Sequence, residues 1–260
     1  MTAIVRMESR NLVRGTLVLT GVFGLLVVFM LAVFPGMAAE AETIEQAFPE
    51  HVAGLFGFEE LHTLEGFLGS YMFPFIWTLF LGIYFAYLGG GMIAGDIRER
   101  RMDLLLSNPV SRESIVLQKI GAIWVPLVAI NVGLFVLLYA GSFVLEESID
   151  PVVLAMAHLL SVPYLLVCAA IGVLMSVVLD RVTSAQAAGL GAVFMLWLLD
   201  GLSEMDPDLE WVGDLTPSRY YDPAAILIHE EYAFGDAAIL LVTFVVLLAI
   251  ATVYFVRRDI

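Results

Sequence analysis

Long apolar runs, separated by shorter polar segments, form the main pattern of this chain. Six runs carry few charges and have roughly the 20 residues that a helix needs to cross a hydrocarbon core of about 30 Å. None shows the alternation of period 2 that is typical of barrel strands. The pattern therefore predicts an all-α integral membrane protein with six transmembrane helices. The runs are 15–35, 67–93, 120–145, 152–179, 185–202 and 237–256.

The first and fifth runs are the least regular. Gln186, Gly189, Gly191 and Asp200 shorten the apolar part of the fifth run. The first run follows several arginines and precedes small residues at 38–41, as in a cleavable signal peptide. Its apolar stretch of about 20 residues is longer than the 7–15 typical of a signal peptide. An uncleaved first span is therefore favoured over a signal peptide.

Basic residues indicate the orientation of the helices, because Lys and Arg are retained on the cytoplasmic side of short loops. Of the twelve in the chain, all but Arg219 fall in segments that the six spans place on one side. The distribution predicts a multi-pass protein of the plasma membrane with both termini in the cytoplasm. The residues on the cytoplasmic side are Arg6, Arg10, Arg14, Arg98, Arg100, Arg101, Arg112, Lys119, Arg181, Arg257 and Arg258.

Composition supports a membrane protein and adds a strong negative charge. Hydrophobic residues make up 60% of the chain, mean hydropathy is +0.92 and the formal net charge is −15. The acids gather in the outer loops, where a hydrated surface is favoured over a cation site. The excess of 27 acids over 12 bases suggests a high-salt organism, a hypothesis that normal folding in low-salt detergent would contradict. We expect one domain, 1–260, with a cytoplasmic segment at 1–14, a cytoplasmic coupling loop at 95–119 and an outer loop at 203–236.

Several kinds of active site are missing from the sequence. A Walker loop needs Gly-Lys-Ser/Thr to hold nucleotide phosphates, and the only lysine, Lys119, stands between Gln and Ile. Any ATP hydrolysis therefore needs a separate subunit. His51 and His62 share an outer loop with glutamates but are expected to be solvated, so no metal site is predicted. Asp96 and Asp236 lie at membrane edges, which disfavours an intramembrane aspartyl protease.

A few polar and small residues lie within the predicted spans. Asn131 and His158 lie deepest, and because polar groups in lipid are costly, hydrogen bonds between helices are favoured over substrate contacts. Cys168 has no disulfide partner and is expected to pack. Glycines along the second span favour either close helix packing, within the chain or in a dimer, or bending of the helix, and both interpretations stay open. They are Gly82, Gly89, Gly90, Gly91 and Gly95.

The polar segment between the second and third runs carries five basic residues. The pattern predicts a short helix from Ile97 to Leu106. A break follows, because the α conformation is disfavoured at Asn108, directly before Pro109. Ser111 then caps a second helix whose first turn holds an acid. Such an element could bind lipid headgroups or dock into a soluble partner, and the residue pattern alone does not separate the two.

The run at 103–112, DLLLSNPVSR, followed by IVL at 115–117 and Lys119, resembles the cytoplasmic loop of ABC-2 type transporter permeases. A weaker similarity lies in LTP at 215–217 and YYDP at 220–223. The resemblance implies a coupling helix between the second and third spans that seats in an ATP-binding subunit. The contact residues it implies are Glu99, Arg100, Arg101, Asp103, Leu104, Leu105, Leu106, Pro109 and Arg112.

The resemblance also implies partners and a direction of transport. We expect an ABC ATP-binding subunit that carries ATP and Mg²⁺, a second permease copy or paralogue, surrounding lipid, no cofactor on this chain and no nucleic acid. Export is favoured over import. Members of the family often have Gly-Thr where this chain has Arg100 and Arg101, which leaves the detailed contacts open. A non-transporting membrane anchor or assembly factor driven by the same ATPase is the main alternative. A secondary transporter is disfavoured because mid-span ionisable residues are scarce.

Overall fold

The computed structural model describes residues 3–47, 60–107, 109–205 and 207–258, and no strand occurs among them. Within these residues, six helical stretches are long and apolar enough to cross a membrane. They coincide with the six predicted runs, including the short fifth one, so the prediction of an all-α membrane protein is confirmed. The stretches are Ile4–Ala41, Leu64–Arg98, Arg112–Val144, Pro151–Val178, Val182–Ser203 and Phe234–Arg257.

The helical elements follow one another with short connections. The first three spans consist of α1 (Ala3–Ala47), then α3 (Leu64–Phe67), η1 (Leu68–Met72), η2 (Pro74–Leu81) and α4 (Gly82–Arg98), and, after α5 (Arg101–Leu106), α6 (Arg112–Gly121) and α7 (Trp124–Val144). The remaining elements are α8 (Pro151–Val178), α9 (Val182–Ser203), η3 (Pro207–Leu209), α10 (Glu210–Gly213), η4 (Ser218–Tyr220), α11 (Pro223–His229) and α12 (Phe234–Arg257).

Local sequence signals explain where several helices begin. Asp150 and Asp222 accept hydrogen bonds from the first backbone amides of α8 and α11, and a proline occupies the first helical position of both. Such a carboxylate satisfies amides that have no partner within the helix, and proline has no amide to satisfy there. Ser111 accepts from the amide of Ser114 and caps α6, as predicted.

The second span is not a regular α-helix throughout. Its N-terminal half, η1 and η2, has π-helical turns, which are wider than α-helical ones and recur at functional sites. Pro74 lies in this stretch and has no amide hydrogen to donate. The widened turns give way to regular α-helix at Gly82.

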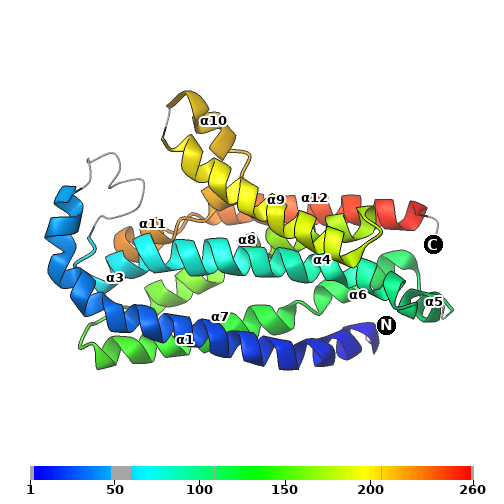
Figure 1. Ribbon diagram of the computed structural model, residues 1–260, viewed down its shortest axis with the longest axis horizontal. Helices are drawn as coiled ribbons and strands as arrows, with labels where there is room; N and C mark the ends of the chain where they lie inside the picture. Colours follow the sequence, from blue (N-terminus) through cyan, green and yellow to red (C-terminus); the bar gives the residue numbers. More distant parts are fainter. Residues whose placement is uncertain (1–2, 48–59, 108, 206, 259–260) are drawn as a thin grey trace.

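Helix α4 lies at the centre of the bundle and packs against α8 and α9, while α12 covers α8 and α1 packs against α7 (Figure 1). Glycines allow the close approach of α4 and α8. A Cβ added at Gly89 would lie 2.2 Å from the backbone oxygen of Ala169, and one added at Gly172 would lie 2.0 Å from that of Ala86. Of the two interpretations of the glycines in the second span, close packing within the chain applies at Gly89.

Both ends of the described chain and α5 lie at one end of the bundle, and α3 and α11 lie at the other (Figure 1). The N-terminal basic segment continues directly into α1, which is helical from Ala3 to Ala47 with Pro35 inside it. The first turns of this long helix pack against α6.

Candidate coupling site

The loop between the second and third spans turns sharply where one helix was expected. Helix α4 ends at Arg98 and α5 begins at Arg101, and Arg100 between them has a φ of 55°, in the left-handed region. This conformation is uncommon for a residue other than glycine. The prediction of one helix over 97–106 was therefore wrong. The turn brings Arg101 back beside Asp96. Helix propensity and capping patterns in the sequence do not predict this contact.

Helix α5 is anchored on one side and exposed on the other. Met102 is fully buried and fixes α5 to the core, whereas Asp103 is exposed and Leu104 is 68% exposed. Leu105 is half-buried, and the side chain of Leu106 lies outside the described part of the structure. The exposed set at this turn also includes Arg98, Glu99, Arg100, Arg101 and Pro109. Asn108, the predicted break, is outside the described residues.

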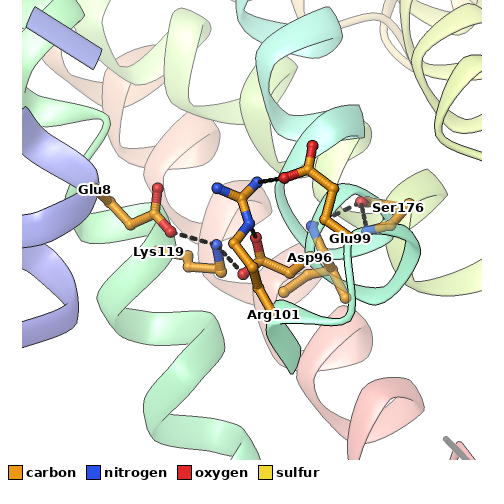
Figure 2. A network of polar contacts seen from close by, with 8 residues as sticks. Glu8, Asp96, Glu99, Arg101, Lys119 and Ser176 are labelled. Carbon is orange, nitrogen blue, oxygen red and sulfur yellow. Dashed lines mark hydrogen bonds and ion pairs between the residues drawn. The ribbon is translucent and has the colours of Figure 1, made fainter. Parts of the chain in front are cut away.

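A buried ion-pair network lies next to Arg101, the first residue of α5 (Figure 2). The Nζ atom of Lys119, at the end of α6, lies 2.6 Å from Asp96 Oδ2 on α4 and 2.6 Å from Glu8 Oε1 on α1. Asp96 and Lys119 are each only 3% exposed. A single ammonium group therefore holds the same end of three spans together.

Arg101 extends this network to α5. Its Nε lies 3.2 Å from Asp96 Oδ1, and its Nη2 lies 2.8 Å from Glu99 Oε2 (Figure 2). The Arg101 side chain is half exposed, so its guanidinium lies between solvent and the buried carboxylate. A cavity of about 220 Å³ borders Glu8, Asp96, Arg101 and Lys119. The network thus joins the exposed turn to α1, α4 and α6.

Ser176 on α8 lies near the same level of the bundle. Its Oγ accepts hydrogen bonds from the amides of Ile93, at 3.0 Å, and Ala94, at 2.9 Å (Figure 2). The hydroxyl is fully buried. These hydrogen bonds therefore join α4 to α8 two to three residues before Asp96.

Arg112, predicted as a partner contact, makes contacts within the chain. Its Nη1 donates to the backbone oxygens of Phe255, at 3.2 Å, and Arg258, at the end of α12. Its guanidinium also lies 5.8 Å from the centre of the Phe255 ring. A cation at a helix C-terminus complements the carbonyls exposed there. Arg112 thus joins the start of the third span to the end of the sixth.

Sequence reasoning missed the two central members of the network. Asp96 was considered only as a protease candidate, and Lys119 only as a basic residue, as the one lysine available for a Walker loop and as part of the family resemblance. Lys119 and Glu8 are 111 positions apart, so no local pattern connects them. Only one weak signal in the sequence indicated this ion pair. The single lysine of the chain lies at a membrane edge, and Asp96, at the end of the preceding span, lies at the same edge.

The two polar residues deep in the spans have different surroundings. Asn131 Oδ1 accepts hydrogen bonds from Trp77 Nε1, at 3.1 Å, and from Ser161 Oγ, at 3.3 Å, so it links η2, α7 and α8. The His158 ring stacks on Trp77 with centroids 4.9 Å apart and also contacts Phe73. Neither ring nitrogen of His158 has a hydrogen-bond partner within the described residues. Asn131 therefore makes the expected contacts between helices, whereas His158 packs as an aromatic ring.

Residues 2–260 match a family model whose description is ABC-2 family transporter protein. The match covers all six spans, α5 and the ion-pair network. No curated protein matched the chain.

Proposed function

The chain belongs to the ABC-2 transporter family, and we propose that it is the permease through which a separate ATP-binding subunit drives export across the plasma membrane. Proteins of this family are membrane subunits that work with an ABC ATP-binding subunit. In the proposal, ATP and Mg²⁺ bind to that partner, and a second permease copy or paralogue completes the pathway. The distribution of Lys and Arg supports a cytoplasmic location for α5 and for both termini.

The ion-pair network carries the proposed role of α5. The exposed turn presents Arg100 and Asp103 to a partner, and buried Met102 fixes α5 to the rest of the bundle. Directly behind this surface, Arg101 pairs with Asp96, which pairs with Lys119. An element that merely lay on lipid headgroups would not need a buried connection to three spans.

The network supports a mechanism for transmitting motion. Closure of the ATP-binding subunits displaces α5. The displacement is transmitted to α4 along the chain and through the ion pair of Arg101 and Asp96. Lys119, which pairs with Asp96 and Glu8, transmits the same displacement to α6 and α1. Buried ion pairs are favourable only when their geometry is good, because desolvation is costly. The ends of the three spans therefore move together, and the path between two permease halves opens or closes.

The proposal is tested by recovering the partner from native membranes with the tagged full-length chain. We expect an ABC ATP-binding subunit, identified by mass spectrometry, to co-purify with the wild type. Its recovery should fall at least about tenfold with a double variant, Arg100→Glu and Asp103→Lys, since charge reversal in an interface costs several kcal/mol. Neither side chain belongs to the ion-pair network, so folding should be preserved.

Arg181→Glu provides the matched control. Arg181 is an exposed arginine in the loop between α8 and α9, on the same predicted side of the membrane. This variant should recover the partner as well as the wild type does. If the Arg100 and Asp103 variant recovers as much partner as the wild type does, the assignment of α5 is refuted. If no well-folded form of the chain recovers an ATP-binding subunit, the permease role is refuted. Where the subunit is recovered, stimulation of its ATPase activity by substrate distinguishes a transporter from a non-transporting anchor.

A further inference from the structure

A second cavity, of about 540 Å³, is lined in part by the start of α11. Helix α11 lies at the end of the bundle opposite α5 (Figure 1). Three segments form its walls: the π-helical stretch at 69–78, the end of α9 with the two residues that follow it, at 197–205, and residues 218–224. This volume lies within the range of roughly 300–1,000 Å³ that is typical of small-molecule sites.

Two buried tyrosines hold the walls of this cavity in place. Tyr221 donates a hydrogen bond to the backbone oxygen of Ala157 on α8, at 2.9 Å. Tyr164, also on α8, donates to the backbone oxygen of Thr78, at 2.6 Å, and the two rings stack with centroids 6.1 Å apart. Helix α8 therefore fixes both the π-helical wall and the 218–224 wall, and the cavity is preformed.

The cavity is lined by buried polar side chains that lack partners. Ser70, Thr78 and Asp200 are between 5% and 9% exposed. Ser70 Oγ, Thr78 Oγ1 and Asp200 Oδ1 have no hydrogen-bond partner in the described part of the chain, although the Asp200 carboxylate also interacts with the hydroxyls of Thr216 and Ser218. A buried polar group without a partner costs about 1–3 kcal/mol. All three can accept a hydrogen bond, so they suit a ligand with several N–H donors.

The charge of the lining is negative. It contains Asp200, Glu204 and Asp222 but only one base, Arg219. That guanidinium is already paired with Glu204, at 3.3 Å, and with Glu210, at 3.5 Å. Asp222 is engaged in capping α11. Asp200 is thus the buried carboxylate that has an oxygen left for a positively charged ligand.

Aromatic rings from η2 and α9 also line the cavity. Phe75 and Trp197 have ring centroids 6.4 Å apart, and Phe75 is 38% exposed. Leu198 and Leu202 add apolar surface beside them. A cation is attracted to the face of an aromatic ring, and apolar groups pack against the same surface.

We propose that this cavity binds an amphipathic protonated amine. The ammonium group donates hydrogen bonds to Asp200 and to the hydroxyls of Ser70 and Thr78, and the apolar body packs against Phe75 and Trp197. The proposal adds a class of substrate to the permease function proposed above. Only the role of the ligand as a transported substrate rests on that function.

Binding is tested on the purified full-length chain in lipid nanodiscs with monodansylcadaverine, which joins a primary ammonium to a fluorescent aromatic body. We expect saturable binding, read from dansyl fluorescence. The neutral N-acetylated derivative should bind at least about 10-fold more weakly, because hydrogen bonds to charged groups are the strong ones. Asp200→Asn should weaken binding of the amine by a similar factor and reduce the preference for amine over acetylated probe.

Asp214→Asn is the matched control, since Asp214 is an exposed acid in the segment that follows α9 and does not line the cavity. Its affinity should equal that of the wild type. Phe75→Leu, at a partly exposed position, should weaken binding about 2- to 5-fold and tests the site independently should Asp200→Asn fold poorly. Equal affinity for the two probes, unchanged affinity in both cavity variants, or no saturable binding to folded wild type would overturn the proposal. The assay needs neither ATP nor a partner, so its failure is distinct from failure of the co-purification.

Discussion

Replacing Lys119 with methionine tests the central contact of the ion-pair network. Methionine has a similar length and suits a buried site, so the change removes charge with little loss of packing. It leaves the carboxylates of Asp96 and Glu8, each 2.6 Å from the ammonium in the wild type, buried close to one another without that cation. Breaking a buried ion pair costs about 3–5 kcal/mol. We expect a loss near the lower end, about 3 kcal/mol, because Arg101 still contacts Asp96.

The free energy of unfolding can be measured by titrating the full-length protein in dodecyl maltoside micelles with SDS and following helix content by circular dichroism. The variant Asp96→Asn and the double variant with Lys119→Met complete a double-mutant cycle. We expect a coupling energy of about 2 kcal/mol between the two positions, within the range of 0.5–3 kcal/mol for residues in one network.

Arg181→Met is the control for loss of a cation, because Arg181 is exposed, and it should change stability by less than about 0.5 kcal/mol. A Lys119→Met variant as stable as this control would refute the view that the network holds the three spans together. Additive effects of the Lys119 and Asp96 changes would refute their direct pairing.

Two further predictions concern packing and charge. Gly172→Ala places a methyl group 2.0 Å from a backbone oxygen of α4 and should cost at least about 2 kcal/mol in the same unfolding assay, whereas Gly191→Ala, with open space around it, should have no such cost and should gain up to about 1 kcal/mol. Burial, followed by the charge of Asp200, raises the pKa of Glu204, and the opposing charge of Arg219 is a smaller influence. A carboxylate with a raised pKa in the folded state stabilises the fold when protonated and loses that contribution as pH rises through this pKa. Glu204→Gln should therefore gain melting temperature relative to the wild type between pH 4 and pH 7, and a constant difference would contradict this assignment.

The membrane-spanning architecture followed from the sequence because lipid leaves the backbone few choices. A run of about 20 apolar residues must satisfy its amides internally, so it forms a helix wherever it lies in the chain. The cap at Ser111 was also predictable, because the capping hydroxyl and its amide are only three residues apart. The short fifth run formed a full helix from Val182 to Ser203 despite its polar residues.

Features that depend on tertiary packing were not predictable in this way. The turn at Arg100 interrupts a segment with good helical character, because Arg101 is drawn to Asp96 and Met102 enters the core. The contacts of Arg112 with the end of α12 could not be predicted from the sequence, and its contact with a partner, implied by the resemblance, stays a prediction. The choice between close packing and bending at Gly89 required the position of α8.

The sequence by itself determined the number of spans, the absence of a Walker loop and the loop that carries the family resemblance. These properties depend on composition, on the length of apolar runs and on the spacing of neighbouring residues, none of which requires the chain to be folded. Only the tertiary structure decided that Glu8, Asp96 and Lys119 meet, and that Ser70, Thr78 and Asp200 line one cavity. Each set joins helices that are far apart in the chain, and ion pairs and hydrogen bonds act only over a few ångströms. Contacts of this kind exist only once helix packing has set the distances.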